Sequence, residues 1–323
     1  KLSVYIFDHD YDDVIDDFTN DKVWAFFGMR RGGQDYGFAD SDLGKVYYGL
    51  DITNPDPSVQ APKLKWKIKK QANAADDFYE LGQTWSRPTV RMLDWDGDGV
   101  SNPKPVVIFG GGYDTKKDID SNIINGFDKN DDGDILDAGD SSNEDYIDTE
   151  GNAIFIVDAD TGDLVWKAVR DCTAFNAGPS TAVCKENSGL KDSIPSNVMA
   201  IDADPDESGI VDRVYVGDTG GVVWRVDLAT DLNSDNRGDW TLEPILSVGR
   251  HATDQPDRRF FNKPDAVFSS DTYGSFTAVL LGSGDRTNPK SEIYTDHFFM
   301  VKDRIPNGNF TNLKTVDILN DIT

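Results

Sequence analysis

Short apolar runs alternate with polar turns along the chain, and no long stretch repeats its apolar residues at the 3.6-residue period of a helix. The recurring unit is a β run that ends in Asp, a turn, and a second β run that ends in Trp or a charged residue. Its copies lie at 46–54 with 64–67, at 153–158 with 164–166, at 221–227 with Trp240 further on, and at 298–303. These runs are rich in Val, Ile, Phe and Tyr, which predicts an all-β fold.

Four further strand-like runs end in glycine, at 23–28, 105–110, 214–217 and 278–282. The Thr161-Gly162-Asp163 turn has hairpin chemistry, because glycine tolerates the positive φ that tight turns require. Repeated strand pairs at this spacing favour a modified β-propeller, complete or incomplete, in which each blade is a small antiparallel sheet. The copies are too uneven for the blades to be counted. A tandem of β-sandwiches remains the structural alternative.

Composition narrows the range of partners. The 323 residues include 58 Asp or Glu and 32 Lys or Arg, which gives a formal net charge of −26. A chain this acidic repels phosphate backbones and anionic lipid surfaces, so we expect no nucleic-acid partner. No run of about 18 apolar residues predicts a membrane-spanning segment. Hydrophobic residues at 38% suffice for a packed core, and we expect 1–323 to form a single domain.

The two cysteines, Cys172 and Cys184, lie close together in a polar stretch. A bridge between them would close a short loop and would fit an oxidising compartment. Two unrelated free thiols remain the alternative. No CxxC spacing indicates zinc.

Much of the negative charge is concentrated in four loops that carry carboxylates at alternate positions. The candidate calcium ligands are Asp8, Asp10, Asp12, the carbonyl of Val14 and Asp16 in the first loop; Asp94, Asp96 and Asp98 in the second; Asp128, Asn130, Asp132, Asp134 and a closing Asp137 or Asp140 in the third; and Asp202, Asp204, Asp206 and Asp212 in the fourth.

The spacing suits calcium, which takes about 6–8 oxygen ligands at roughly 2.3–2.6 Å. A tight turn with carboxylates at its first, third and fifth positions wraps them around one ion. Without a cation, such carboxylates repel one another by on the order of 1 kcal/mol per pair even in bulk water. The loops lack the closing Glu of an EF-hand, and Asp13 stands where glycine is usual. Solvated acidic turns remain the alternative for each loop. Magnesium demands stricter octahedral geometry, so a flexible acidic loop favours calcium.

Catalytic signals are weak. The three histidines, His9, His251 and His297, have no GxSxG elbow or cysteine nucleophile as a partner. The glycine-rich run at 109–114 precedes no predicted helix that could hold a phosphate. Arg237-Gly238-Asp239 spells the tripeptide that integrins recognise, although an ordinary loop is the preferred interpretation. We therefore expect a protein that is not an enzyme.

Several runs together resemble one known family: 27–33, 47–53, 85–88, 107–114, 151–155, 214–218, 220–225 and 282–286. In this order they are similar to the PilC/PilY family of type IV pilus tip and biogenesis proteins. The resemblance implies the modified β-propeller of the family's C-terminal region. It also implies a calcium site on Asp202, Asp204, Asp206 and Asp212, with a carbonyl from Ser208 or Ile210. The two additional residues Glu207-Ser208 depart from the family's loop, and about ten residues around 35–43 separate two of the runs.

The resemblance further implies a function. We expect a calcium-binding, non-enzymatic protein that acts in surface adhesion and in calcium-dependent control of pilus extension and retraction. The expected partners are minor pilins or the pilus tip, together with a host-cell receptor or an abiotic surface. The expected location is the cell surface or pilus tip, associated with the outer membrane of a Gram-negative bacterium. Family members are longer, so we interpret the chain as a fragment of a longer one. The alternatives are a quinoprotein-like or glycan-lyase-like propeller enzyme with structural calcium, and a structural spacer.

Overall fold

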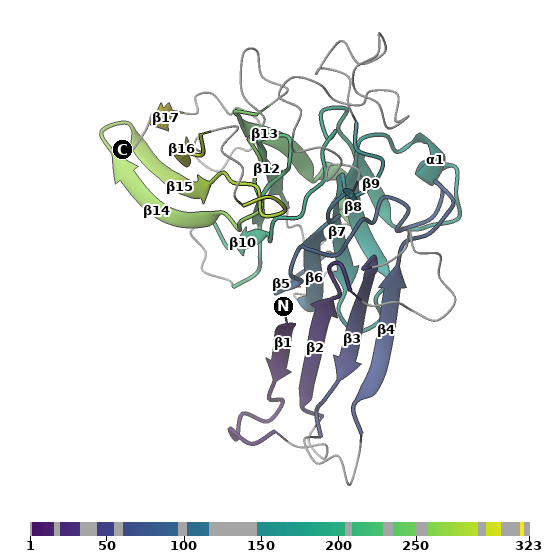
Figure 1. The fold of residues 1–323 in the computed structure, drawn as a ribbon. Helices are drawn as coiled ribbons and strands as arrows, with labels where there is room; N and C mark the ends of the chain where they lie inside the picture. The colour runs from purple at the N-terminus through teal and green to yellow at the C-terminus, as the bar shows by residue number, and fades with distance from the viewer. Residues whose placement is uncertain are drawn as a thin grey trace.

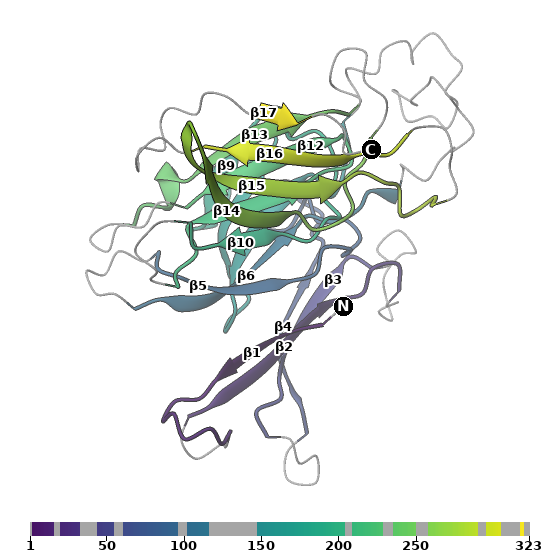
Figure 2. The same cartoon turned by 90° about the vertical axis from the view of Figure 1, so that its left-hand side faces the viewer.

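The computed structural model describes residues 2–15, 20–32, 44–54, 61–95, 102–115, 147–203, 209–228, 235–249, 258–289 and 295–304, and the backbone of 317–319. In these parts the chain forms four sheets of consecutive strands (Figures 1 and 2).

The strands of the first sheet are β1 (Leu2–Phe7), β2 (Lys22–Gly28), β3 (Val46–Asp51) and β4 (Lys63–Lys69). Those of the second are β5 (Thr89–Leu93), β6 (Lys104–Gly110), β7 (Ala153–Asp158), β8 (Leu164–Val169) and β9 (Val183–Glu186). Those of the third are β10 (Met199–Ile201), β11 (Arg213–Gly217), β12 (Val222–Asp227) and β13 (Thr241–Ser247). Those of the fourth are β14 (Asp265–Asp271), β15 (Gly274–Gly282), β16 (Phe298–Asp303) and β17 (Asp317–Leu319). The short helices α1 (Thr173–Asn176) and η3 (Arg237–Asp239) lie in connections.

Within each sheet the strands follow sequence order and pair antiparallel, except that β9 adds to β8 in parallel. The first strands of successive sheets are in contact, β1 with β5, β5 with β10, and β10 with β14. Up-and-down sheets arranged around their first strands are the blades of a β-propeller. The structure therefore confirms the all-β, propeller-type prediction over the tandem of sandwiches.

The apolar core fills the spaces between neighbouring blades. Between the first two blades, the ring of Trp66 stacks on Phe26 with centroids 5.4 Å apart, and its indole Nε1 donates a 2.9 Å hydrogen bond to the carbonyl of Ala159. The turn residue Gly162 has φ +78°, and a Cβ there would lie 2.7 Å from Cγ of Trp66. Glycine is thus required both by the turn and by the tryptophan that packs on it. Trp166 and Trp240 lie together in the core between the second and third blades.

The first blade carries apolar side chains on both faces. Trp24 is buried towards the second blade. On alternate positions of β1, Leu2, Val4 and Ile6 remain 55%, 45% and 63% exposed. Because successive side chains of a strand point to opposite faces, these three residues define an apolar outer face of the first blade.

A buried charged network joins the third and fourth blades. Arg225 donates 2.9 Å and 2.8 Å hydrogen bonds to Asp303 and Asp227. The Tyr215 hydroxyl donates a 2.6 Å bond to Asp303, and Arg213 donates a 2.9 Å bond to Asp227. All five side chains are nearly inaccessible to solvent. Paired and hydrogen-bonded charges can be buried in this way, whereas a single one could not.

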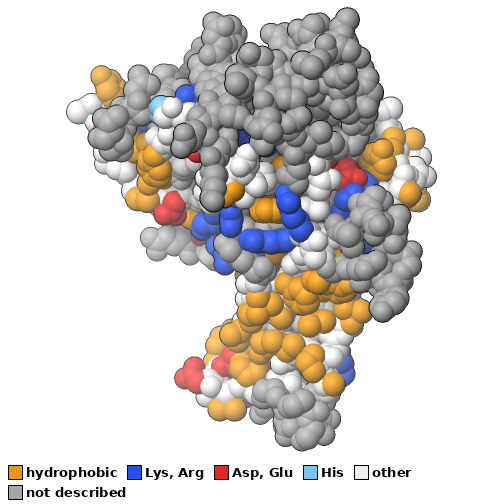
Figure 3. All heavy atoms as spheres, viewed as in Figure 1, with side chains coloured by type: hydrophobic (Ala, Val, Ile, Leu, Met, Phe, Trp, Pro, Cys, Tyr) orange, Lys and Arg blue, Asp and Glu red, His pale blue; other side chains and the backbone are white. Residues whose placement is uncertain are grey.

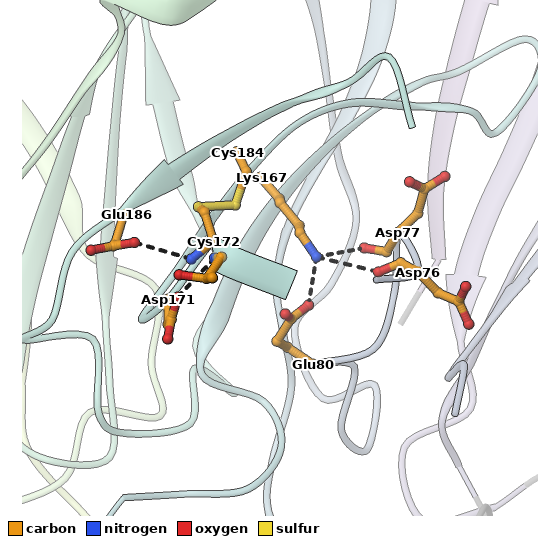
Figure 4. The surroundings of a disulfide bond; sticks show 9 residues. Asp76, Asp77, Glu80, Lys167, Asp171, Cys172, Cys184 and Glu186 are labelled. Atoms are coloured by element: carbon orange, nitrogen blue, oxygen red, sulfur yellow. Dashed lines mark hydrogen bonds and ion pairs between the residues drawn. A yellow bond between two sulfur atoms is a disulfide. The ribbon is translucent and has the colours of Figure 1, made fainter. Parts of the chain in front are cut away.

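Cys172 and Cys184 form a disulfide across 12 residues, which confirms the bridged alternative (Figure 4). The bridge ties the residue before α1 to β9. Nearby, Lys167 extends from β8 towards Glu80, 2.9 Å away, and towards two backbone carbonyls (Figure 4). The disulfide and this buried ion pair fix the outer edge of the second blade.

Among the described residues, no helix combines the length and apolar character needed to cross a bilayer.

Candidate metal centre

Three of the four acidic loops occupy the same place in successive blades. Asp8 directly follows β1, Asp94 follows β5 and Asp202 follows β10, so each loop connects the first strand of a blade to its second. Because these strands pair antiparallel, the two ends of each loop lie side by side. A carboxylate at the start of a loop therefore meets whatever residue ends the loop.

The first loop brings three carboxylates together. The β1–β2 ladder ends with Phe7 opposite Lys22, so Asp8 and Asp21 face each other across the base of the loop. Carboxylate oxygens of Asp8, Asp10 and Asp21 all lie within 4.8 Å of one another. Asp21 is only 5% exposed. Asp8 and Asp10 were predicted from their spacing, whereas Asp21 was not.

Backbone amides of the loop orient these carboxylates. Tyr11 and Asp13 donate hydrogen bonds of 2.8 Å and 2.9 Å to the two oxygens of Asp8. The amide of His9 donates a 2.7 Å bond to Oδ1 of Asp21. Tyr11 and Asp13 have φ values of 60° and 64°, which curl the chain around the group. Asp thus adopts the left-handed conformation usually given to glycine, one that Asp and Asn reach more readily than most residues.

The remaining predicted ligands of this loop differ in their placement. Oδ1 of Asp12 accepts a 2.8 Å hydrogen bond from the amide of Val14, and Asp12 is not one of the three clustered carboxylates. Asp16 lies outside the described residues.

The clustered charges alter proton affinity. Desolvation, followed by the negative charges of Asp12, Asp21 and Asp8, raises the pKa of Asp10. A group of carboxylates that resists full ionisation is stabilised by a cation. The donors are oxygen atoms alone, which suits a hard ion such as calcium and not the nitrogen and sulfur preference of zinc.

The fourth loop repeats the arrangement at its base. Ile201 pairs with Arg213, which places Asp202 opposite Asp212. Asp212 accepts a 2.7 Å bond from the amide of Ala203, and Oδ2 of Asp202 accepts a 2.6 Å bond from the amide of Gly209. Oδ1 of Asp202 is buried without a hydrogen-bond partner in the described part of the chain. A buried carboxylate oxygen of this kind is a suitable ligand atom for a cation.

The second loop lies beside the fourth. The carboxylate of Asp94 is buried and accepts a 3.1 Å bond from the amide of Asn102, across the base of its loop. The amide of Val211 donates a 3.0 Å bond to the carbonyl of Met92, and Met92 and Ile210 form a parallel bridge. The start of the second loop and the end of the fourth are therefore held together.

The other predicted ligands lie outside the described residues. They are Asp96 and Asp98 of the second loop; Asp128, Asn130, Asp132, Asp134, Asp137 and Asp140 of the third; and Asp204, Asp206 and Ser208 of the fourth.

The Arg237-Gly238-Asp239 tripeptide forms the helix η3. Two nitrogens of Arg237 bind the two oxygens of Asp235, at 2.8 Å and 2.6 Å, and a third donates a 3.0 Å bond to the carbonyl of Val165. The guanidinium is thus held against its own loop and β8. This geometry favours the ordinary-loop interpretation over a presented adhesion motif.

Comparison with known proteins gives a match in structure alone. No family model matches the chain, and no curated protein matches its sequence significantly. The crystal structure of the Pseudomonas aeruginosa PilY1 C-terminal domain superposes with a TM-score of 0.54 at 17% identity, over 95% of this chain and 49% of that one. The chain therefore spans about half the length of that structure. At this identity the match shows the fold, and it confirms the PilC/PilY resemblance at that level.

Two further structures align less well. An exo-β-1,3-galactanase from Clostridium thermocellum aligns at 10% identity with a TM-score of 0.33, over 92% of this chain and 45% of that one. BamB from Moraxella catarrhalis aligns at 11% identity with a TM-score of 0.30, over 87% of this chain and 67% of that one. Neither carries a conclusion about this chain.

Proposed function

We propose that the chain is a non-enzymatic, calcium-binding protein associated with type IV pili, acting in surface adhesion and in calcium-dependent control of pilus extension and retraction. Two findings support the pilus association: the ordered motifs that resemble the PilC/PilY family, and the fold shared with the PilY1 C-terminal domain. The partners proposed from this resemblance are minor pilins or the pilus tip, together with a host-cell receptor or an abiotic surface to which the protein adheres.

One observation carries the calcium proposal, namely the convergence of Asp8, Asp10 and Asp21. Two come from one turn and the third lies directly before β2, so the ligand set joins the start of the loop to its end at the sheet. Carboxylates so close together repel one another unless a cation lies among them. Oδ1 of Asp202, which is buried and has no hydrogen-bond partner among the described residues, supports a second site in the fourth loop.

Binding of calcium to these sites would make the conformation of the loops depend on the calcium concentration. With calcium bound, the first loop is tied to β2 through Asp21, and without it the carboxylates favour a more open loop. A surface formed by these loops would then be presented to a partner in one state and withdrawn in the other. The disulfide fits an exported protein at the cell surface, where the environment is oxidising.

Thermal unfolding of the full chain tests the calcium proposal. We expect millimolar calcium to raise the unfolding midpoint of the wild type, since a ligand that binds only the folded state stabilises it. Asp21→Asn should reduce the shift. Asp163→Asn removes one charge from an exposed turn outside the acidic loops and should leave the shift unchanged. An equal shift in Asp21→Asn and Asp163→Asn would contradict the site.

The pilus proposal needs a separate test in the bacterium that produces the chain. Replacing Asp8 and Asp21 together by Asn should alter pilus number and twitching, while Asp163→Asn should not. If the double variant loses calcium in vitro but leaves piliation and twitching intact, the pilus role is wrong and the calcium site stands.

A further inference from the structure

A cavity of about 300 Å³ opens where the first strands of the blades meet. Leu2, Ser3 and Val4 of β1 line one side, with Ser3 directed at the carbonyl of Pro88. The opposite wall comes from Arg87, which precedes β5, and from Arg91 within it. Val198 and Lys263 complete the lining. This volume lies at the lower end of the range for ligand sites.

Three cations line this cavity in a chain whose net charge is −26. Arg91 donates hydrogen bonds of 3.1 Å and 2.8 Å to the carbonyls of Ala200 and Val90. Lys263 lies 3.3 Å from the sulfur of Met199. Within the described part of the chain, none of the three pairs with a carboxylate. Figure 3 shows Lys and Arg side chains gathered in the hollow above the sheet of β1–β4.

Arg87, one of the lining residues, carries an unmet hydrogen-bonding group behind the cavity surface. Nε of Arg87 is buried and has no hydrogen-bond partner among the described residues. Leaving a buried donor unsatisfied is costly, and for a charged group more so. Burial, and then the charge of Arg87, lower the pKa of Arg91. An anion in the cavity would offset the repulsion between Arg87 and Arg91.

The arrangement of the walls indicates an extended ligand. β1 pairs only with β2 among the described ladders, so it is an edge strand, whereas the other side of β5 already bridges Ile210 at Met92. Successive side chains of an extended peptide point to opposite sides, so its alternate residues face the same wall. An edge strand can hydrogen-bond an added peptide, while alternate side chains enter pockets. The exposed apolar side chains of Leu2 and Val4 beside these cations favour such a peptide over a simple inorganic ion.

We propose that this cavity binds an extended peptide segment of a partner protein in which acidic and apolar residues alternate. Its carboxylates pair with Arg87, Arg91 and Lys263, and its apolar side chains pack on Leu2 and Val4. The site is separate from the acidic loops and does not depend on calcium.

Fluorescence anisotropy of the full chain with a labelled octapeptide of alternating glutamate and valine tests the proposal. The same peptide with glutamine in place of glutamate should bind at least tenfold more weakly. Arg91→Gln and Lys263→Gln should each weaken binding of the acidic peptide about tenfold, the loss expected for one charge-assisted hydrogen bond. Lys63→Gln, an exposed change on β4 outside the cavity, is the control and should bind as the wild type does. Binding should also weaken as salt is added.

Three results would overturn the proposal. The first is equal affinity for the glutamate and glutamine peptides. The second is unchanged affinity in both Arg91→Gln and Lys263→Gln; Lys263 is exposed, so its replacement leaves the fold intact. The third is inorganic sulfate binding as tightly as the acidic peptide, which would make the cavity a simple anion site.

Discussion

The backbone amide of His9 donates a 2.7 Å hydrogen bond to Oδ1 of Asp21, twelve residues further along the chain. This bond closes the first acidic loop on itself and sets Asp21 beside Asp8 and Asp10. The candidate metal centre is therefore a product of the β1–β2 hairpin as much as of the Asp-rich turn.

Ion stoichiometry should report the first and fourth loops separately. Asp8→Ala and Asp202→Ala should each lower the number of bound calcium ions by one, because each removes the first ligand of a different loop. Isothermal titration calorimetry measures the number directly. The double variant should lose two ions. An unchanged stoichiometry in either single variant would mean that the loop it alters binds no calcium.

Calcium binding should weaken as the pH falls. The raised pKa of Asp10 means that protons compete with calcium at a higher pH than they do at an ordinary Asp. In the calcium-free chain the sign is opposite, because protonation below that raised pKa relieves repulsion and adds to stability. The calcium-induced shift of the unfolding midpoint should therefore shrink between neutral pH and about pH 4. A shift that stays constant across this range would argue against carboxylate ligands.

The disulfide should contribute to stability independently of calcium. Replacing Cys172 and Cys184 together by Ser should lower the free energy of unfolding by about 3 kcal/mol, as the chain-entropy treatment of a short loop gives. Urea unfolding in the presence of a chelator measures the loss. The same loss should appear with saturating calcium, and a loss found only in the calcium-bound form would mean that the bridge acts through the ion sites.

The bond between Arg225 and Asp303 should be a major tie between the third and fourth blades. Asp303→Ala leaves Arg225 buried without one of its partners, and removing one member of a buried pair typically costs about 3–5 kcal/mol. Urea unfolding compares this variant with Asp265→Ala, which changes an exposed residue on β14 of the same blade. Equal stability of the two variants would contradict the role of the network.

Strands with continuous apolar runs, such as β7 and β12, which are buried on both faces, were predicted from the sequence. The first strands of the blades were not predicted. β5 contains Arg91 between apolar residues, and β14 is largely exposed, so neither has the run that marks a buried strand. These strands form because other segments of the chain pair with them. The local pattern of apolar residues does not reveal such pairing.

The same limit applies to the candidate site. Asp8 and Asp10 lie two residues apart in one turn, so their spacing alone predicts a shared ion. Asp21 reaches them only through the pairing of β1 with β2, and nothing next to it in the sequence marks it as a ligand. Its position two residues before the predicted strand at 23–28, opposite a loop that begins with Asp, was the one available signal.

Diffraction from crystals of the chain grown with calcium tests the central claim most directly. The account predicts an anomalous peak surrounded by carboxylate oxygens of Asp8, Asp10 and Asp21 at about 2.3–2.6 Å. Ordered water alone among these three side chains, with calcium present in the crystal, would contradict it.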